Sequence, residues 1–202
     1  MKLRGSVFGW KSVWMELAEE RKGDFIDGTT LVKMSFPLKA KPWTLSMQMH
    51  SSPIGSSLNE TTIIAAPFVA RHPLTFAIRN TKTVEEIAKV FGMQDIVIGE
   101  TAFDKEYIIQ GNNVEMVREL FSVAELRESI EGQKAVNLCI ADAHNNHFGF
   151  TPTERVHVLT FTEKGAINSF DRLTSLESLF TITLDLLHSI GVASLEQPDF
   201  VI

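Results

Sequence analysis

The 202-residue chain has an ordinary globular composition, with 44% hydrophobic and 22% charged residues, which excludes the disordered, collagen-like and low-complexity classes. Nineteen basic and 25 acidic residues give a formal net charge of −6, and no dense basic stretch is interleaved with aromatic residues, so nucleic-acid binding is not expected. A chain of this length buries about 70% of its unfolded surface and needs no disulfide or metal to fold.

The cysteine content and the start of the chain bear on the compartment. The single cysteine, Cys139, lies in the apolar run AVNLCIAD and has no partner for an intramolecular disulfide, so we expect a buried thiol. Lys11 and Glu16 interrupt the apolar stretch near the N-terminus, unlike a signal peptide. No window approaches the run of about 18 apolar residues that a membrane-spanning helix needs. These features predict a soluble cytoplasmic protein.

The first 80 residues predict one helix and four strands. Apolar residues spaced by three and four positions over 9–22 indicate a helix that ends at Gly23, and they are Trp10, Val13, Trp14, Leu17 and Ala18. Runs with strand character follow at 29–38, 43–50, 61–70 and 74–80, and short connections between them favour an antiparallel meander. Pro37 and Pro67 point to sheet edges or bulges.

The middle of the chain predicts three helices and two short strands. The segment 81–92 has a helix-capping candidate at Thr83, Glu86 three residues later and Gly92 at its end. Short strands are expected at 96–99 and 106–111 around a turn at 101–105, followed by two short helices within 112–132. Asn113 can cap the first of these helices and Gly132 can end the second.

The last third predicts three strands and a long helix. Strands at 134–142 and 147–152 flank the turn-forming AHNN, and a third strand covers 155–162. The helix at about 171–190 has one apolar stripe, formed by Leu173, Leu176, Leu179, Phe180, Thr183, Leu186, Leu187 and Ile190. The predicted fold class is therefore α+β, with a largely antiparallel sheet, inserted helices and a long C-terminal helix packed on the sheet. We expect a single domain over residues 1–202, with the first few residues and the tail 194–202 loosely packed.

Five segments carry a family resemblance. They are WMELAEERKGDF, TTIIAAPF, FGMQDIVIGETAFDKEYIIQGNNVEMVRELF, HFGF and DRLTSLESLFTITLDLLHSIGVA. With them the chain resembles a family of bacterial proteins, a domain of unknown function, whose central motif is of the type FGMQDIxIGxxxFDxxxIIxGN. The resemblance spans nearly the whole chain. It implies a bacterial origin and a single domain, and it brings no reaction, ligand or catalytic residue.

The segment DAHNNHF is the first candidate for chemistry. Asp142, His144 and His147 fall within six residues at the tip of a predicted hairpin, and two imidazoles with a carboxylate can share a metal ion. The structural interpretation is a turn, because Asn and Asp tolerate the left-handed backbone of hairpin turns. We favour the turn and expect no metal and no cofactor; if a metal is bound, these three residues are its expected ligands.

The segment GETAFDKEYIIQG is the second candidate. It contains Glu100, Asp104, Glu106 and Tyr107, and paired carboxylates can act in acid–base chemistry when burial separates their pKa values. The alternative is a solvated turn that Phe103 anchors in the core. We favour that alternative, and keep the four residues as binding candidates because they lie in the centre of the family resemblance.

No complete catalytic motif accompanies these two segments. The sequence contains no phosphate-binding loop, dinucleotide fingerprint or nucleophile elbow. The leading hypothesis is therefore a non-catalytic binding or interaction domain with an unidentified protein or small molecule as partner. Two alternatives stay open: a metal-dependent hydrolase that uses the 142–147 turn, and a carrier that holds a small apolar ligand between sheet and helix.

Overall fold

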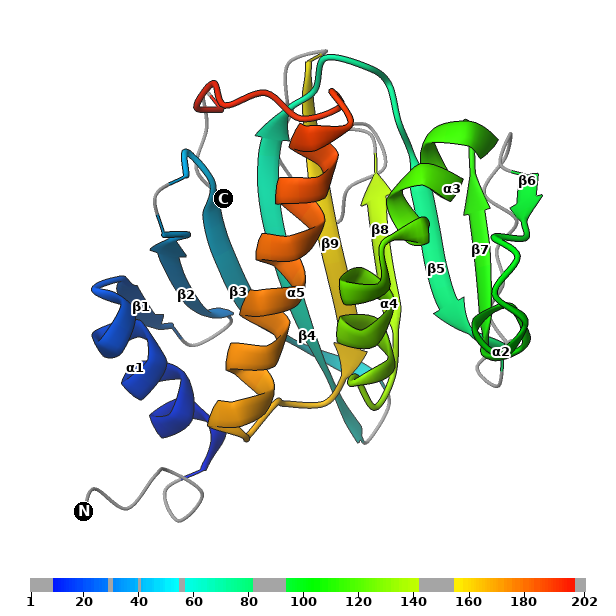
Figure 1. Cartoon of the computed structure of the whole chain (residues 1–202). Helices are drawn as coiled ribbons and strands as arrows, with labels where there is room; N and C mark the ends of the chain where they lie inside the picture. The colour runs from blue at the N-terminus through cyan, green and yellow to red at the C-terminus, as the bar shows by residue number, and fades with distance from the viewer. Residues whose placement is uncertain are drawn as a thin grey trace.

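The computed structural model describes residues 9–28, 31–39, 41–54, 57–81, 94–141 and 155–198. Its fold is α+β, with helices packed on one face of a nine-stranded sheet (Figure 1). The helices are α1 (Trp10–Arg21), α2 (Thr101–Glu106), α3 (Val114–Ser122), α4 (Ala124–Glu131) and α5 (Phe170–Ser189). The strands are β1 (Asp24–Asp27), β2 (Leu31–Pro37), β3 (Thr44–Ile54), β4 (Ser57–Val69), β5 (Phe76–Asn80), β6 (Gln94–Ile96), β7 (Tyr107–Gly111), β8 (Asn137–Ala141) and β9 (Val156–Lys164).

The sheet is antiparallel throughout, in the order β1-β2-β3-β4-β9-β8-β5-β7-β6. The expected meander is correct for the strands up to β4 and wrong for β5. Strands β9 and β8 from the last third of the chain lie between β4 and β5. The reason is that local turn signals report which strands are consecutive, whereas a pairing across some 90 residues leaves no local signal.

Three elements differ from the sequence predictions. The strand predicted at 96–99 overlaps β6 (Gln94–Ile96) only at Ile96, because the Ile98 and Gly99 N–H groups donate to the Asp104 carboxylate. The edge strand β1 was not predicted, because DFID has only two apolar residues and no alternating pattern. Residues 101–105, predicted as a turn, form the short helix α2 instead, since Asp104 holds the preceding loop against its first turn. The predicted helix over 81–92 and the predicted strand at 147–152 lie outside the described residues, apart from Thr81.

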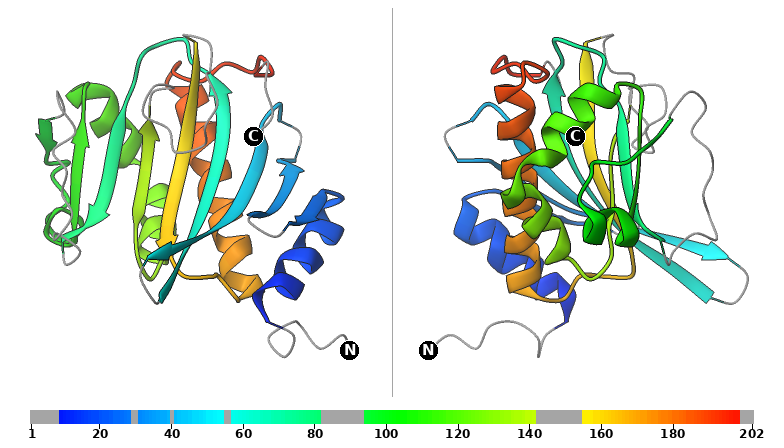
Figure 2. Two further views of the ribbon diagram at one scale, coloured as in Figure 1. Left: turned by 180° about the vertical axis from the view of Figure 1, so that it is seen from behind. Right: turned by 45° about the vertical axis from the view of Figure 1, so that its right-hand side comes forward.

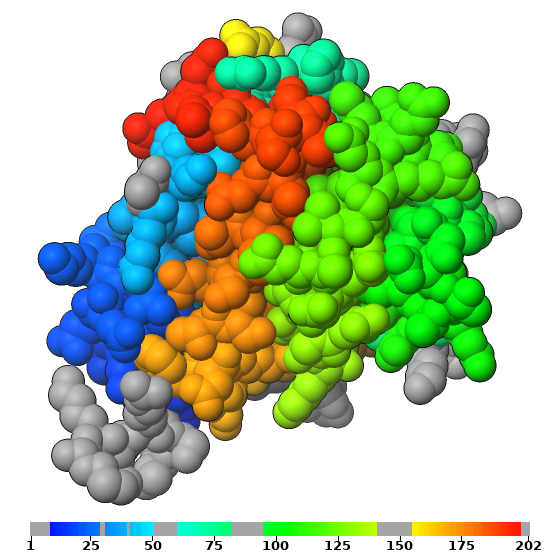
Figure 3. Space-filling view, viewed as in Figure 1, coloured from blue at the N-terminus to red at the C-terminus, as the bar shows by residue number. Residues whose placement is uncertain are grey.

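Helices α1, α3, α4 and α5 lie side by side over one face of the sheet (Figure 3). Six of the eight residues in the predicted stripe on α5 are buried: Leu173, Leu176, Leu179, Phe180, Thr183 and Leu187. The other two, Leu186 and Ile190, are partly buried and pack against the core. Helix α1 buries Val13, Trp14, Leu17 and Ala18 as predicted, and the Trp14 indole donates to the Ile167 carbonyl oxygen at 2.9 Å. Among the described residues, no helix is long and apolar enough to cross a membrane.

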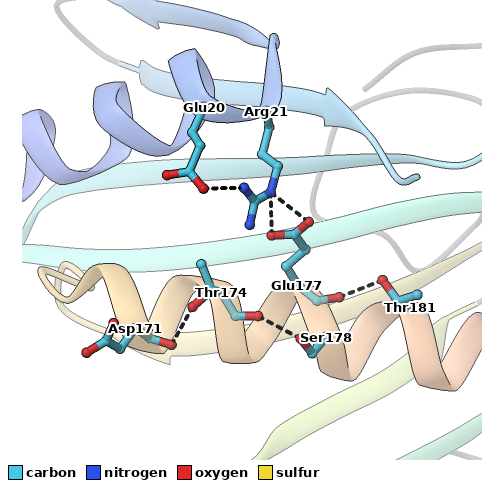
Figure 4. A network of polar contacts seen from close by, with 7 residues as sticks. All are labelled: Glu20, Arg21, Asp171, Thr174, Glu177, Ser178 and Thr181. Carbon is cyan, nitrogen blue, oxygen red and sulfur yellow. Dashed lines mark hydrogen bonds and ion pairs between the residues drawn. The ribbon is translucent and has the colours of Figure 1, made fainter.

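A charged contact fastens α1 to α5 (Figure 4). Arg21 Nε lies 3.0 Å from both carboxylate oxygens of Glu177, and its guanidinium also donates to Glu20 Oε1 at 2.8 Å. The Arg21 and Glu177 side chains are only 17% and 13% exposed. The hydrogen bond to Glu177 is the main reason that the pKa of Arg21 is raised. A charge this well paired tolerates removal from water.

The opposite face of the sheet carries no helix in the part of the chain that the structure describes (Figure 2). Two rows of residues that are paired across all nine strands, one residue apart in each strand, show how the two faces differ. The apolar row on the helix side consists of Phe25, Met34, Met47, Ile64, Phe161, Leu138, Ile78, Ile109 and Ile96. The polar row on the other side consists of Asp24, Ser35, Ser46, Ala65, Thr160, Cys139, Ala77, Gln110 and Asp95.

Pro37 and Pro67, which were predicted to mark sheet edges or bulges, both lie where a strand lacks a partner on one side. Pro37 ends β2 and is exposed. Pro67 lies in an interior strand, but the β3–β4 pairing stops at Ala65, and Pro67 is paired only with Val158 of β9. Strand β4 is therefore locally an edge at Pro67, which is where a residue without an N–H group fits.

Candidate functional site

In the central segment, which the sequence marked as a binding candidate, one side chain binds the backbone of the preceding loop. The Asp104 carboxylate accepts hydrogen bonds from the Ile98 N–H at 3.0 Å and from the Gly99 N–H at 2.9 Å. Gly99 has φ +94°, a left-handed conformation that favours glycine. Both carboxylate oxygens of Asp104 are thus engaged in shaping the loop before α2, which is a structural role for this residue.

The other three residues of this segment have different surroundings. Glu100 pairs with Arg127 Nη2 of α4 at 3.2 Å, and Arg127 also donates to the Phe121 and Ser122 carbonyl oxygens. Glu106 is exposed. Tyr107 is buried, with its ring centroid 4.6 Å from that of Phe103.

Burial is the main reason that the pKa of Tyr107 is raised, and the charges of Glu106 and Glu131 act in the same direction. Its phenol is therefore neutral at neutral pH. The contacts give Asp104 and Glu100 structural roles, in the loop before α2 and in the pairing with α4. A binding role for Glu100, Asp104, Glu106 and Tyr107 stays a prediction.

The other sequence candidates, Asp142, His144 and His147, lie outside the described residues. Within the described ranges, no group of three or more His, Cys, Asp or Glu side chains is arranged to hold a metal ion. The turn and metal interpretations of residues 142–147 both remain predictions.

A chain of hydrogen bonds crosses three adjacent strands on the helix-free face. Arg79 of β5 donates from Nε to Asn137 Oδ1 of β8 at 3.1 Å. The Asn137 amide donates in turn to the Thr162 hydroxyl of β9 through a short contact. All three side chains are partly buried. Arg79 and Asn137 are directly paired in the β5–β8 register, so the sheet itself positions the first of these contacts.

Arg79 differs from the other arginines that the structure describes. Four of them pair with a carboxylate: Arg21, Arg127, Arg155 and Arg172. Within the described ranges Arg71, Arg79 and Arg118 have no carboxylate partner, and of these three only Arg79 is partly buried. The guanidinium is a partly buried cation whose two Nη groups have no partner in the part of the chain that the structure describes.

Cys139 lies beside Arg79 on this face, on the polar row. Burial raises the pKa of the Cys139 thiol, and the positive charge of Arg79 lowers it by a smaller amount. The thiol is therefore neutral at neutral pH and is not a nucleophilic thiolate. The expectation that Cys139 is buried is wrong: it is partly buried and lies on the face opposite the main core. Alternation along β8 turns Leu138 and Ile140 to the helices instead.

Further polar groups on the helix-free face lie on β3. The Ser46 hydroxyl is buried and has no hydrogen-bond partner among the described residues. Gln48 Oε1 lies 3.1 Å from His50 Nε2. Parts of this face are fully buried, as at Ala65 and Val158, whereas Arg79, Asn137 and Thr162 keep partial exposure. The partly exposed Arg79–Asn137–Thr162 chain is the candidate functional site.

Sequence reasoning missed this site, although one signal was present. In the strand FAIRN, an arginine follows three apolar residues before the strand ends. A cation there shows that one face of the strand is not packed in a core. Its partners Asn137 and Thr162 come from strands that the sequence did not place beside β5.

Comparison with known proteins bears on the fold alone. No protein-family model and no curated protein matches the sequence. A solved structure described as the crystal structure of the mycobacterial trehalose monomycolate transport factor A, TtfA, aligns with 89% of this chain and 95% of its own, at 11% sequence identity and a TM-score of 0.53. The protein thus shares the fold of a mycobacterial transport factor.

Proposed function

We propose that this protein is a non-catalytic binding domain whose ligand site lies on the helix-free face of the sheet, around Arg79. The observation that carries the proposal is the partly buried Arg79 guanidinium, which has no carboxylate partner among the described residues. Leaving a cation partly desolvated costs free energy unless something compensates it. A bound ligand would supply that compensation.

The distribution of roles between the two faces supports this proposal. The helix-facing side is filled by a continuous core of apolar side chains that stabilises the fold. The helix-free face instead carries side chains with hydrogen-bonding capacity, among them Ser46, Asn137 and Thr162. An apolar ligand between sheet and helix would have to displace core side chains, so a site on the other face fits the packing better.

The fold likeness is compatible with a binding role. The solved structure is described as a transport factor, which is a protein named for moving a molecule rather than for a reaction. At 11% identity the likeness carries no ligand to this chain. It supports a binding or carrier class and leaves the ligand to be argued from this protein's own residues.

The enzyme alternative is addressed by a separate measurement. If Asp142, His144 and His147 hold a metal, protein purified without a histidine tag should contain stoichiometric metal, and chelation should lower its melting temperature. His144→Ala and His147→Ala should then each reduce the metal content. If the segment is a turn, both substitutions should change stability by less than about 0.5 kcal/mol.

Amide-resonance NMR with a panel of small ligands tests the proposed function. The panel contains sugars, amines, carboxylates, phosphates and fatty acids. We expect at least one class to shift amide resonances of Ala77, Cys139 and Thr160 on the polar row, with smaller shifts at Leu176 and Leu184 in the core. Binding that shifts only helix or core residues would contradict the helix-free face as the site.

A further inference from the structure

We infer that Arg79 binds an oxyanion, the carboxylate or phosphate group of a small ligand, with Asn137 and Thr162 positioning its guanidinium. This inference rests on the proposed function, because it names the chemistry that the same face would recognise.

The geometry favours a two-point contact with the anion. The Asn137 side chain occupies the Nε–H of Arg79, which leaves the edge formed by the two Nη groups free of described partners. That edge presents two parallel N–H donors, the arrangement that matches two oxygens of a carboxylate or phosphate. Thr162 accepts from the Asn137 amide and so fixes the orientation of that amide. Less side-chain freedom is then lost on binding.

Among the described residues, nothing with a negative charge is paired with Arg79. Its register neighbours are Ile108 on β7 and Asn137 on β8, and neither carries a charge. The Cys139 thiol nearby is protonated at neutral pH. Asp95 lies on β6, two strands from Arg79, and its Oδ1 accepts a hydrogen bond from Gln110 at 2.8 Å. No anion in the described structure therefore competes for the guanidinium.

The overall charge makes the expected binding specific to this site. A chain of formal net charge −6 repels small anions in general. An oxyanion that binds must therefore be held by a local arrangement of hydrogen-bond donors. Among the described residues, the partly buried guanidinium of Arg79 offers such an arrangement. Both a free anion and the anionic headgroup of a lipid would present this chemistry.

Titration of the full chain with defined probes tests the inference. The probes are inorganic phosphate, acetate and decanoate, followed by amide-resonance NMR, and vesicles of phosphatidylglycerol against vesicles of phosphatidylcholine in a sedimentation assay. Preference for phosphate or acetate would identify a free anion, preference for decanoate an anion with an apolar tail, and retention on phosphatidylglycerol alone a lipid headgroup.

Three variants separate the site from general charge effects. Arg79→Gln removes the charge, and Asn137→Asp places a carboxylate beside Arg79 with little change of shape. Arg71→Gln is the matched control, because it removes the same charge from an exposed arginine without a described side-chain partner. Melting temperatures of all variants show whether each is folded.

We expect Arg79→Gln and Asn137→Asp to weaken binding at least about tenfold and Arg71→Gln to change it less than about twofold. Equal losses in Arg79→Gln and Arg71→Gln, or binding unaffected by Arg79→Gln, would overturn the inference. Should Asn137→Asp fail to fold, Arg79→Lys, which keeps the charge but loses the two-point edge, must weaken binding more than Arg71→Gln does. If no oxyanion binds while a neutral ligand shifts the polar row, the inference fails and the proposed function stands.

Discussion

The apolar row and the polar row are one residue apart in every strand, yet they have opposite characters. Eight of the nine side chains in the apolar row are buried hydrophobic residues, and Phe25 packs against the same core. The polar row has acidic residues at both ends and small or hydroxyl-bearing residues at its centre. Because successive side chains in a strand alternate between faces, one chain builds both a core and a second surface with different chemistry.

Two arginines, one on each face, show how the same charged group serves different roles. On the helix side, Arg21 is paired with Glu177 and Glu20, so its charge serves to join two helices. On the helix-free side, the one side-chain hydrogen bond of Arg79 to a described residue runs from Nε to the neutral Asn137. A charge that is paired within the fold contributes to stability, whereas one that is positioned but unpaired is available to a ligand.

The largest effect is expected from the core beneath α5. Leu179→Ala or Leu187→Ala should each lower the free energy of unfolding by about 2–5 kcal/mol, because both side chains are fully buried. On the polar row, Ser35→Ala should change it by less than about 0.5 kcal/mol. Denaturant unfolding measures both, and similar costs on the two rows would break the comparison. Two separate unfolding transitions would contradict the single domain expected from the sequence.

A smaller effect is expected from the contact between α1 and α5. Arg21→Ala should cost about 1–3 kcal/mol, because the largely buried Glu177 loses its charged partner. A double-mutant cycle with Glu177→Ala isolates the pairwise contribution. Additive costs in that cycle would mean that the two side chains stabilise the fold independently.

Arg79→Gln sharpens the contrast between the two arginines. Without ligand, this substitution should change the free energy of unfolding by less than about 0.5 kcal/mol, since no ion pair with a described residue is lost. The same replacement at Arg21 should be clearly destabilising. A stability loss at Arg79 as large as that at Arg21 would assign Arg79 a structural role.

The smallest effect concerns the reactivity of Cys139 and how it depends on pH. Because the pKa of its thiol is raised in the folded protein, alkylation by iodoacetamide should reach its half-maximal rate at a higher pH than for free cysteine. The folded state holds the thiol proton more tightly than the unfolded state, so the stabilisation from this group is complete below the ordinary thiol pKa and declines as pH rises above it.

The same measurement tests whether Arg79 lies beside the thiol. Arg79→Gln removes the charge that lowers the pKa of Cys139, so the alkylation profile should move to still higher pH. A shift toward lower pH would contradict the placement of the guanidinium next to Cys139.

The sequence by itself determined the elements whose signals are local. The apolar spacing of α5, the Asn113 cap of α3 and the alternation in β3 follow from periodicity and backbone hydrogen bonding within a few residues. From these elements the α+β class follows as well. The short edge strand β1 was not predicted, because its four residues depend on pairing with β2. The helix α2 was not predicted either, because it depends on the loop that Asp104 binds.

Only the tertiary structure decided which strands are neighbours, and therefore where the candidate site lies. Inserting β9 and β8 between β4 and β5 brings Asn137 and Thr162 to Arg79 across separations of 58 and 25 residues in the two hydrogen bonds. The alternation in β5 predicts that Arg79 lies on the face away from the core, but it does not predict which side chains contact Arg79 on that face. Pairing between distant strands depends on burial summed over the whole sheet, and no local sequence pattern records that sum.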